Sequence, residues 1–177
     1  GMRSFTMDTV SVPRGRMYLN GEQIRLRGAN TMGHLQQCVI RGDTAQLIVD
    51  ILLAKLCNMN YLRLTQRPVQ PEIYEWFDKL GLHNQTDLPL FGSLRRNLFS
   101  EAVKQAEEME RLVRKHPSTI MVSYINERFP NAEGQPQRSS GELAEYERLF
   151  TALDQAVLIT NPDRVIKAGD GDYDPPS

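Results

Sequence analysis

Residues 120–127 read Ile-Met-Val-Ser-Tyr-Ile-Asn-Glu, and this stretch decides the fold. Its apolar residues predict a strand that is buried in a core and that ends at Asn126 and Glu127. A carboxyl group at the rim of an apolar core loses water and tends to stay protonated, which is the state that a general acid needs. Taken alone, the stretch also fits a capped strand end with a solvated glutamate.

Strands and helices alternate on both sides of this stretch. Asn20-Gly21 predicts a tight hairpin turn between strands at 17–19 and 23–26. Apolar spacing then predicts helices at 43–56, 71–80, 100–115 and 143–157, and strands at 59–65, 82–88, 119–125 and 165–168. Such alternation implies parallel strands with right-handed crossovers. Two architectures fit, an open doubly wound sheet and part of an eight-fold barrel.

Polar residues after the strands favour the barrel. The turn after the first strand reads Arg27-Gly28-Ala29-Asn30 and lacks the Gly-x-Gly-x-x-Gly pattern of a doubly wound dinucleotide site. Barrel enzymes collect polar groups where strands end. Here such groups follow five strands, at Asn30, Thr65-Gln66, Asp87, Asn126-Glu127 and Asp170. The expected fold class is therefore α/β, an incomplete (β/α)8 TIM barrel of about five parallel strands and four helices, preceded by a β-hairpin.

Composition excludes several classes of partner. The chain has 177 residues, enough for one domain with a sizeable core, and 21 basic against 22 acidic residues. This balance argues against nucleic acid and against a polybasic membrane anchor, and no apolar run reaches the length of a membrane span. Cys38 and Cys57 form no disulfide framework or metal motif, so we expect no metal and no cofactor. No signal peptide is recognisable, and the cellular compartment stays open.

Six stretches of the chain form a recognisable series: residues 18–21 (YLNG), 24–30 (IRLRGAN), 58–63 (NMNYLR), 74–82 (YEWFDKLGL), 115–118 (KHPS) and the 120–127 strand with its Asn-Glu ending. Together they resemble the catalytic barrel of family 2 glycoside hydrolases, the group of β-galactosidases, β-mannosidases and β-glucuronidases. The resemblance covers the chain from about Gly15 onward. It implies residues 1–14 as a leader of tag and linker remnant, and 15–177 as part of a TIM barrel.

The resemblance also implies roles and a partner. Glu127 matches the general acid/base, and Asn126 matches the residue that bonds the sugar 2-hydroxyl. Arg63 matches an arginine that orients a carboxylate, and Asp87 stands where the family has an acidic residue near sugar hydroxyls. The implied sugar-binding set is completed by Asn30 and His34. The implied partner is a carbohydrate, a β-glycoside.

Departures from the family pattern leave the sugar open. Asn30 is followed by Thr31-Met32-Gly33-His34, where the family often has Arg-His-Glu-His, and Gln66 stands where many members have a histidine. In the family the nucleophilic glutamate follows the seventh strand, and a full barrel needs about 250 residues. We therefore expect a truncated, inactive hydrolase.

Truncation also predicts how the chain behaves in solution. Unpaired barrel edges should drive it to a homo-oligomer. Two other functions stay open at this point. One is a non-catalytic carbohydrate-binding or interaction module, and the other is a different α/β enzyme with an open sheet.

Overall fold

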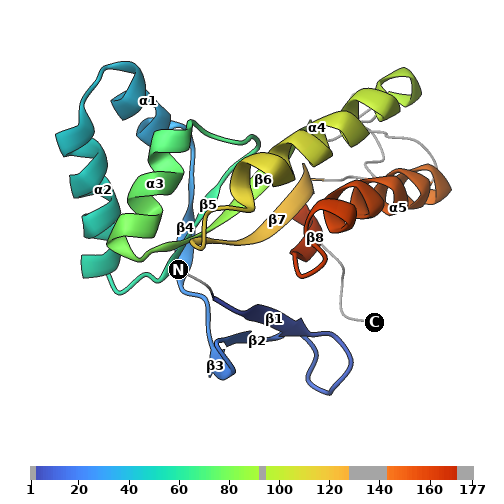
Figure 1. The fold of residues 1–177 in the computed structure, drawn as a ribbon, viewed down its shortest axis with the longest axis horizontal. Coiled ribbons are helices and arrows are strands. Elements are labelled where there is room, and N and C mark those ends of the chain that lie inside the picture. The colour runs from blue at the N-terminus through green and yellow to red at the C-terminus, as the bar shows by residue number, and fades with distance from the viewer. Residues whose placement is uncertain (1–2, 92–94, 128–142, 171–177) are drawn as a thin grey trace, which may run out of the picture.

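The chain forms two separate sheets, as Figure 1 shows for the computed structural model, which describes residues 3–91, 95–127 and 143–170. The smaller sheet is antiparallel and contains β1 (Phe5–Asp8), β2 (Arg16–Leu19) and β3 (Glu22–Ile24). The larger sheet is parallel and contains β4 (Gly28–Thr31), β5 (Tyr61–Leu64), β6 (His83–Phe91), β7 (Thr119–Asn126) and β8 (Val165–Asp170). Its crossovers carry α1 (His34–Ile40), α2 (Thr44–Leu56), α3 (Pro71–Leu80), α4 (Phe99–Val113), preceded by a 3-10 turn at Arg96–Leu98, and α5 (Leu143–Thr160).

Strand order identifies the larger sheet as part of a barrel. The order β4-β5-β6-β7-β8 follows the chain, and each neighbouring pair is parallel. A doubly wound sheet reverses its order at a switch point, and none occurs here among the described strands. The predicted α/β class with a partial TIM barrel is therefore confirmed, and the open-sheet alternative is not supported.

The helix ends follow the chemistry that the sequence indicates. Asp43 caps α2, because its carboxylate accepts a hydrogen bond from the backbone N–H of Gln46 at 3.0 Å. Pro71 opens α3, where its missing N–H leaves no helical bond unmade. Gly81 ends that helix with φ 66°, a left-handed conformation that glycine adopts at little cost.

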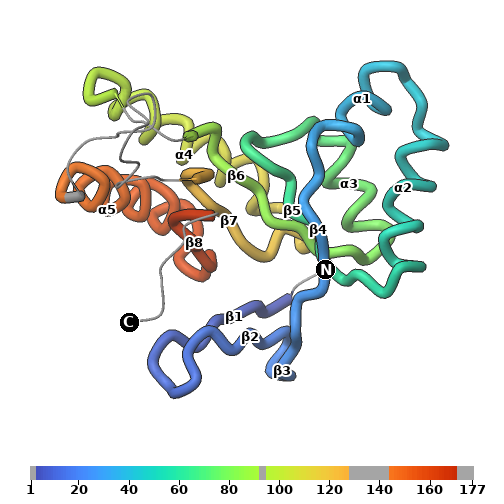
Figure 2. Tube along the Cα trace, turned by 180° about the vertical axis from the view of Figure 1, so that it is seen from behind, coloured from blue at the N-terminus to red at the C-terminus, as the bar shows by residue number. Residues whose placement is uncertain are grey.

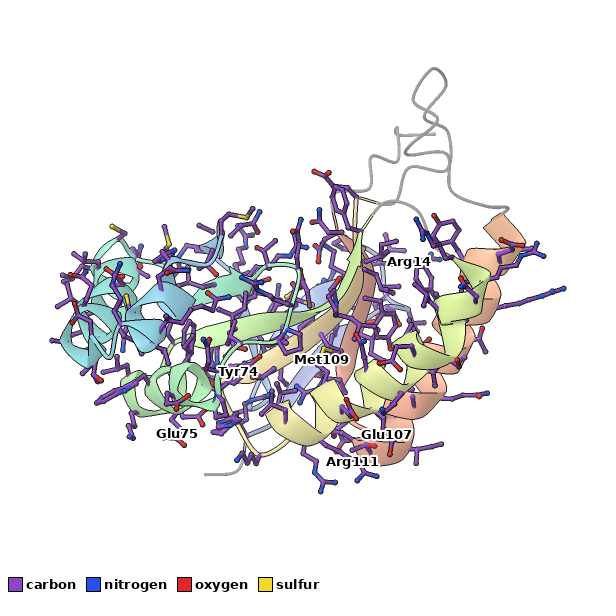
Figure 3. All side chains as sticks on the ribbon, turned by 90° about the horizontal axis from the view of Figure 1, so that it is seen from above. Arg14, Tyr74, Glu75, Glu107, Met109 and Arg111 are labelled. Atoms are coloured by element: carbon purple, nitrogen blue, oxygen red, sulfur yellow. The ribbon has the colours of Figure 1, made fainter. Side chains whose placement is uncertain are left out.

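Each helix contributes buried apolar side chains to the core, and α4 shows this best. Figure 3 places Met109 on the inner side of α4 and Glu107 and Arg111 on its outer side. Met109 is buried, whereas Glu107 and Arg111 form an exposed ion pair one turn apart, with 2.6 Å between Oε1 and Nη2. The surface of α4 that faces the core is thus mainly apolar, and its one buried charge, Glu110, is paired with Arg164.

The small antiparallel sheet lies at the end where the parallel strands begin, as the view from behind in Figure 2 also shows. Phe5 packs with Ile120 and Met121 at the start of β7 in a second apolar cluster. The hairpin turn is as predicted, because Asn20 and Gly21 have φ values of 53° and 84°. The opposite end of the larger sheet, where the strands finish, is left free of this cover.

Three elements differ from the sequence-based expectation. The second strand of the hairpin was expected to run up to a turn at residues 27–30, but it ends at Ile24, and Gly28–Thr31 forms the separate strand β4 of the larger sheet. Phe5–Asp8 forms β1 within residues 1–14, the segment expected to be a leader. His34–Ile40 forms α1, where no helix was predicted, and the residue before it, Gly33 with φ 99°, has no side chain to cap the helix. None of the described helices has the length and apolar character needed to cross a membrane.

Candidate active site

Arg63 joins three strands at the carboxyl end of the parallel sheet. From β5, its Nε and Nη2 donate to Oδ2 of Asp87 on β6, at 2.9 and 2.6 Å. Nη2 also donates to Oδ1 of Asn126 on β7, at 2.8 Å. All three side chains are buried. The structure therefore brings together three of the residues that the resemblance singles out.

Asp87 is surrounded by hydrogen-bond donors. Only 2% of the residue is exposed, and besides Arg63 it accepts from the backbone N–H of Gln66 at 3.0 Å and from Nε2 of Gln85 at 3.0 Å. Burial raises the pKa of this carboxyl, against the opposing effect of these donors and of the Arg63 charge. Both of its oxygens accept hydrogen bonds from the protein, so Asp87 holds the side chains of Arg63 and Gln85 in position.

Asp170 closes the network from the end of β8. Its Oδ2 lies 3.4 Å from Nε of Arg63 and accepts from Nε2 of Gln85, and its Oδ1 accepts from Lys167. Burial alone would raise the pKa of Asp170, but the hydrogen bond and charge of Lys167, with the charge of Arg63, hold this pKa below its usual value. The carboxylate form is therefore favoured here.

Gln85 and Tyr61 belong to this network, although the sequence did not single them out. The Tyr61 hydroxyl donates to Oε1 of Gln85 at 2.5 Å, while Nε2 of Gln85 donates to Asp87 and Asp170. Burial, and then the charges of the two aspartates, raise the pKa of Tyr61, which keeps its hydroxyl a donor. The available signal was spacing, because residues 61 and 63 share one face of β5 and residues 85 and 87 one face of β6.

Asn126 presents one half of its amide to the protein and keeps the other half free. Oδ1 is held by Arg63, while Nδ2 makes no hydrogen bond to any residue that the structure describes. Glu127 follows at once, half-buried, with φ 52°. This left-handed turn ends β7, and the Glu127 backbone N–H donates to the carbonyl oxygen of Asp170 at 2.6 Å. Glu127 therefore lies at the strand-end face, beside the end of β8.

Asn30 and His34 lie apart from this network. Asn30 is paired in register with Arg63 on the neighbouring strand, but it is exposed. His34 is exposed at the first residue of α1. Neither side chain forms a hydrogen bond with a described residue, so both belong to the rim of the strand-end face.

The fold and the polar cluster define a class of protein. In (β/α)8-barrel enzymes, the active site forms at the carboxyl ends of the strands, from side chains on several strands. Arg63, Asp87, Asn126 and Asp170 occupy this position on four consecutive strands. The cluster is therefore the candidate active site of a barrel enzyme.

Comparison with known proteins gives the family. The family model described as glycosyl hydrolases family 2, TIM barrel domain, matches residues 10–168, and the chain belongs to this family. The predicted resemblance is thereby confirmed.

Solved structures share the fold. A Bacteroides uniformis β-glucuronidase matches with a TM-score of 0.67 at 21% identity, over 94% of this chain and 20% of its own. A Parabacteroides merdae β-glucuronidase with glycerol in its active site has a TM-score of 0.74 at 18% identity, over 94% and 20%. An uncultured Clostridium β-glucuronidase has a TM-score of 0.70 at 18% identity, over 96% and 28%. The chain thus spans between a fifth and about a quarter of their length.

Proposed function

We propose that this chain supplies the acid/base side of a retaining β-glycosidase site, with Glu127 as the general acid/base. The observation that carries the proposal is the Asn126 amide, fixed by Arg63 immediately before Glu127 at the strand ends. Since Arg63 holds Oδ1, Nδ2, which has no partner among the described residues, is a donor for a substrate hydroxyl. A hydrogen bond to the sugar 2-hydroxyl that strengthens in the transition state is what this chemistry uses.

Arg63 and Asp87 take positioning roles in this proposal. Asp87 was expected near sugar hydroxyls, but both of its oxygens accept from protein donors, so it is better suited to orient Arg63. Arg63 in turn orients Asn126. Asn30 and His34, both exposed, are proposed to contact the sugar from the rim.

A retaining mechanism needs a second carboxyl group about 5 Å from the first. Among the described strand ends, the other carboxylates are Asp87 and Asp170, and both are engaged by Arg63 and further donors. We therefore place the nucleophile outside the described residues. The 177-residue chain alone is expected to lack turnover.

The acid/base role is tested in a polypeptide that joins this chain to the remaining barrel units of the family. Aryl β-glucuronides are the first substrates to assay, because the structural neighbours named above are β-glucuronidases. Glu127→Ala should slow hydrolysis of substrates with poor leaving groups by about 10²–10⁴-fold, and of activated ones much less. Added azide should restore turnover of the activated substrate, because azide is an anionic nucleophile and attacks the glycosyl-enzyme intermediate without help from a general base.

The same assays can refute the role of Glu127, provide a control and test the alternative function. Equal loss on good and poor leaving groups, without azide rescue, would refute the role of Glu127. The exposed Glu72→Gln is the matched control and should leave all rates unchanged. Saturable sugar binding with no turnover in the joined polypeptide would favour the carbohydrate-binding module.

Self-association is proposed from the exposed apolar surface of α2. Val49, Leu52, Leu53 and Leu56 are all exposed and recur at helical spacing on this helix. Together with the edge strands β4 and β8, this stripe favours a homo-oligomer. Light scattering should show a mass above that of the monomer, reduced by Leu53→Glu with Leu56→Glu. A monomer at micromolar concentration would contradict the proposal.

A further inference from the structure

A cavity lies at the opposite end of the larger sheet from the candidate active site. It has a volume of about 630 Å³ and opens between β1, the loop before β7 and the loop before β8. Volumes of about 300–1,000 Å³ are typical of small-molecule sites. Four basic side chains line it, Arg3, Arg114, Lys115 and Arg164, against one acidic side chain, Asp163.

Arg3 carries a positive charge that no carboxylate neutralises at close range. Its Nε donates to the carbonyl oxygen of Pro117 and its Nη2 to that of Thr119. Its guanidinium lies 6.0 Å from the centre of the Phe5 ring. Within the described part of the chain, Arg3 has no ion pair within 4 Å, and its Nη1 has no hydrogen-bond partner. Arg3 is therefore a pre-positioned cation with free donors.

Arg164 differs from Arg3 because its charge is matched. Its Nε and Nη2 each donate to the carboxylate of the buried Glu110, both at 2.8 Å. Its Nη1 donates to the carbonyl oxygen of Thr119, which Arg3 also uses. Burial and then the nearby Arg164 charge lower the pKa of Arg3 to about 10, while Asp78 and Glu110 act against them. Two guanidiniums thus converge on one carbonyl, and of the two, Arg164 alone has a counter-ion among the described residues.

The remaining lining groups add to the excess of positive charge. Arg114 and Lys115 are exposed at the end of α4 and form no described ion pair. His116 also lines the cavity, and its buried Nε2 has no hydrogen-bond partner in the described structure, while its Nδ1 lies 2.7 Å from Oδ2 of Asp78. An anion in the cavity would neutralise the positive charges of Arg3, Arg114 and Lys115, which have no counter-ion among the described residues.

We propose that this cavity binds the phosphate group of a small organic phosphate. Guanidinium groups bind phosphate oxygens through parallel N–H donors, and lysine adds a point charge. Cations from three segments of the chain suit an anion with several oxygens and more than one negative charge. The volume leaves room for the organic group that bears the phosphate.

Titration of the 177-residue chain with pyrophosphate tests the proposal, at constant ionic strength, with thermal unfolding and amide NMR shifts as readouts. Pyrophosphate should raise the unfolding midpoint in a saturable way, because a ligand that binds the folded state stabilises it. The double variant Arg114→Gln/Lys115→Gln should bind about fivefold or more weakly, as expected for two lost charge contacts. Amide shifts should concentrate in residues 3–7, 114–117 and 161–165.

The matched control carries the same charge change elsewhere. Arg41→Gln/Lys104→Gln removes two exposed charges that do not line the cavity, one after α1 and one about 15 Å along α4 from Arg114, and should leave affinity within about twofold, because the Debye length in ordinary buffer is only about 10 Å. Arg3→Gln should weaken binding further, and the double variant keeps the test valid if Arg3→Gln fails to fold. Absence of saturable binding, an equal loss in the control pair, or equally tight binding of citrate would overturn the proposal.

Discussion

Asp87→Asn is the sharpest test of the network at the strand ends. Asparagine keeps the shape of the side chain but replaces one acceptor oxygen with a donor. If its oxygen faces Arg63 and Gln66, its Nδ2 faces Nε2 of Gln85, and two donors meet. Gln85 cannot turn its amide without losing its bonds from Tyr61 and to Asp170. The substitution therefore leaves an unsatisfied buried donor and an under-compensated Arg63.

The expected loss of stability follows from the burial of the Arg63–Asp87 pair. Removing one partner of a buried ion pair costs about 3–5 kcal/mol, and Asp87 is 2% exposed. With a urea m-value of about 2 kcal/mol per molar, the midpoint of urea unfolding should fall by roughly 2 M. Because Arg63 then holds Asn126 less firmly, the Asn126 side-chain amide should exchange faster with solvent. Equilibrium urea unfolding and NMR measure both effects.

Two further variants complete the experiment. Arg63→Met/Asp87→Leu removes both charges and should recover at least half of the loss, because neither member of the pair stays buried alone and Asp170 keeps Lys167 as its partner. Glu107→Gln makes the same chemical change in an exposed ion pair, with side chains 44% and 64% exposed, and should cost less than about 1 kcal/mol. A cost for Asp87→Asn as small as that of Glu107→Gln would refute the reasoning.

Three more outcomes are expected. Glu110→Gln should lower the free energy of unfolding by about 3–5 kcal/mol in urea titrations, because Glu110 is fully buried and Arg164 would lose its counter-ion. Gln66→Gly should raise it by up to about 1 kcal/mol, and Gln66→Ala should not, because Gln66 has φ 67° and only glycine relieves this conformation. Asp170 has a lowered pKa, so its stabilisation is complete above its unfolded pKa of about 3.9 and is lost as the pH falls through its lower folded value. Below about pH 4, the free energy of unfolding of Asp170→Asn should therefore fall less steeply with decreasing pH than that of the unsubstituted chain. An unchanged slope would contradict this.

Sequence patterns were sufficient for elements whose cause is local. The 120–127 stretch, the Asn20-Gly21 turn and the Gly81 helix end each depend on neighbouring residues, and each occurs where it was predicted. In contrast, β1 has only four residues, and it is a strand because it pairs with β2 and packs Phe5 against β7. Such pairing depends on contacts that are distant in sequence, so local pattern could not reveal it.

The candidate site was predictable in part for a similar reason. Asn126 and Glu127 follow an apolar strand, so their position at its end could be read directly. Gln85 and Tyr61 lie inside strands, and their roles depend on which face of each strand meets its neighbour. The contact of Asp87 with four donors likewise required the register of β5 against β6. Sequence therefore indicated where polar groups gather, but not how they bind one another.

The buried polar face has a consequence for how the sheet aligns during folding. Sliding β5 along β6 by two residues would keep every apolar side chain on its original face, so hydrophobic burial alone discriminates weakly against this error. The same slide would move the guanidinium of Arg63 several ångströms from its acceptor on β6 and leave both charges without compensation. The buried Arg63–Asp87 pair thus favours one register of β5 against β6. Replacing both residues with apolar ones is expected to give a sheet that is stable but has a less uniquely defined register.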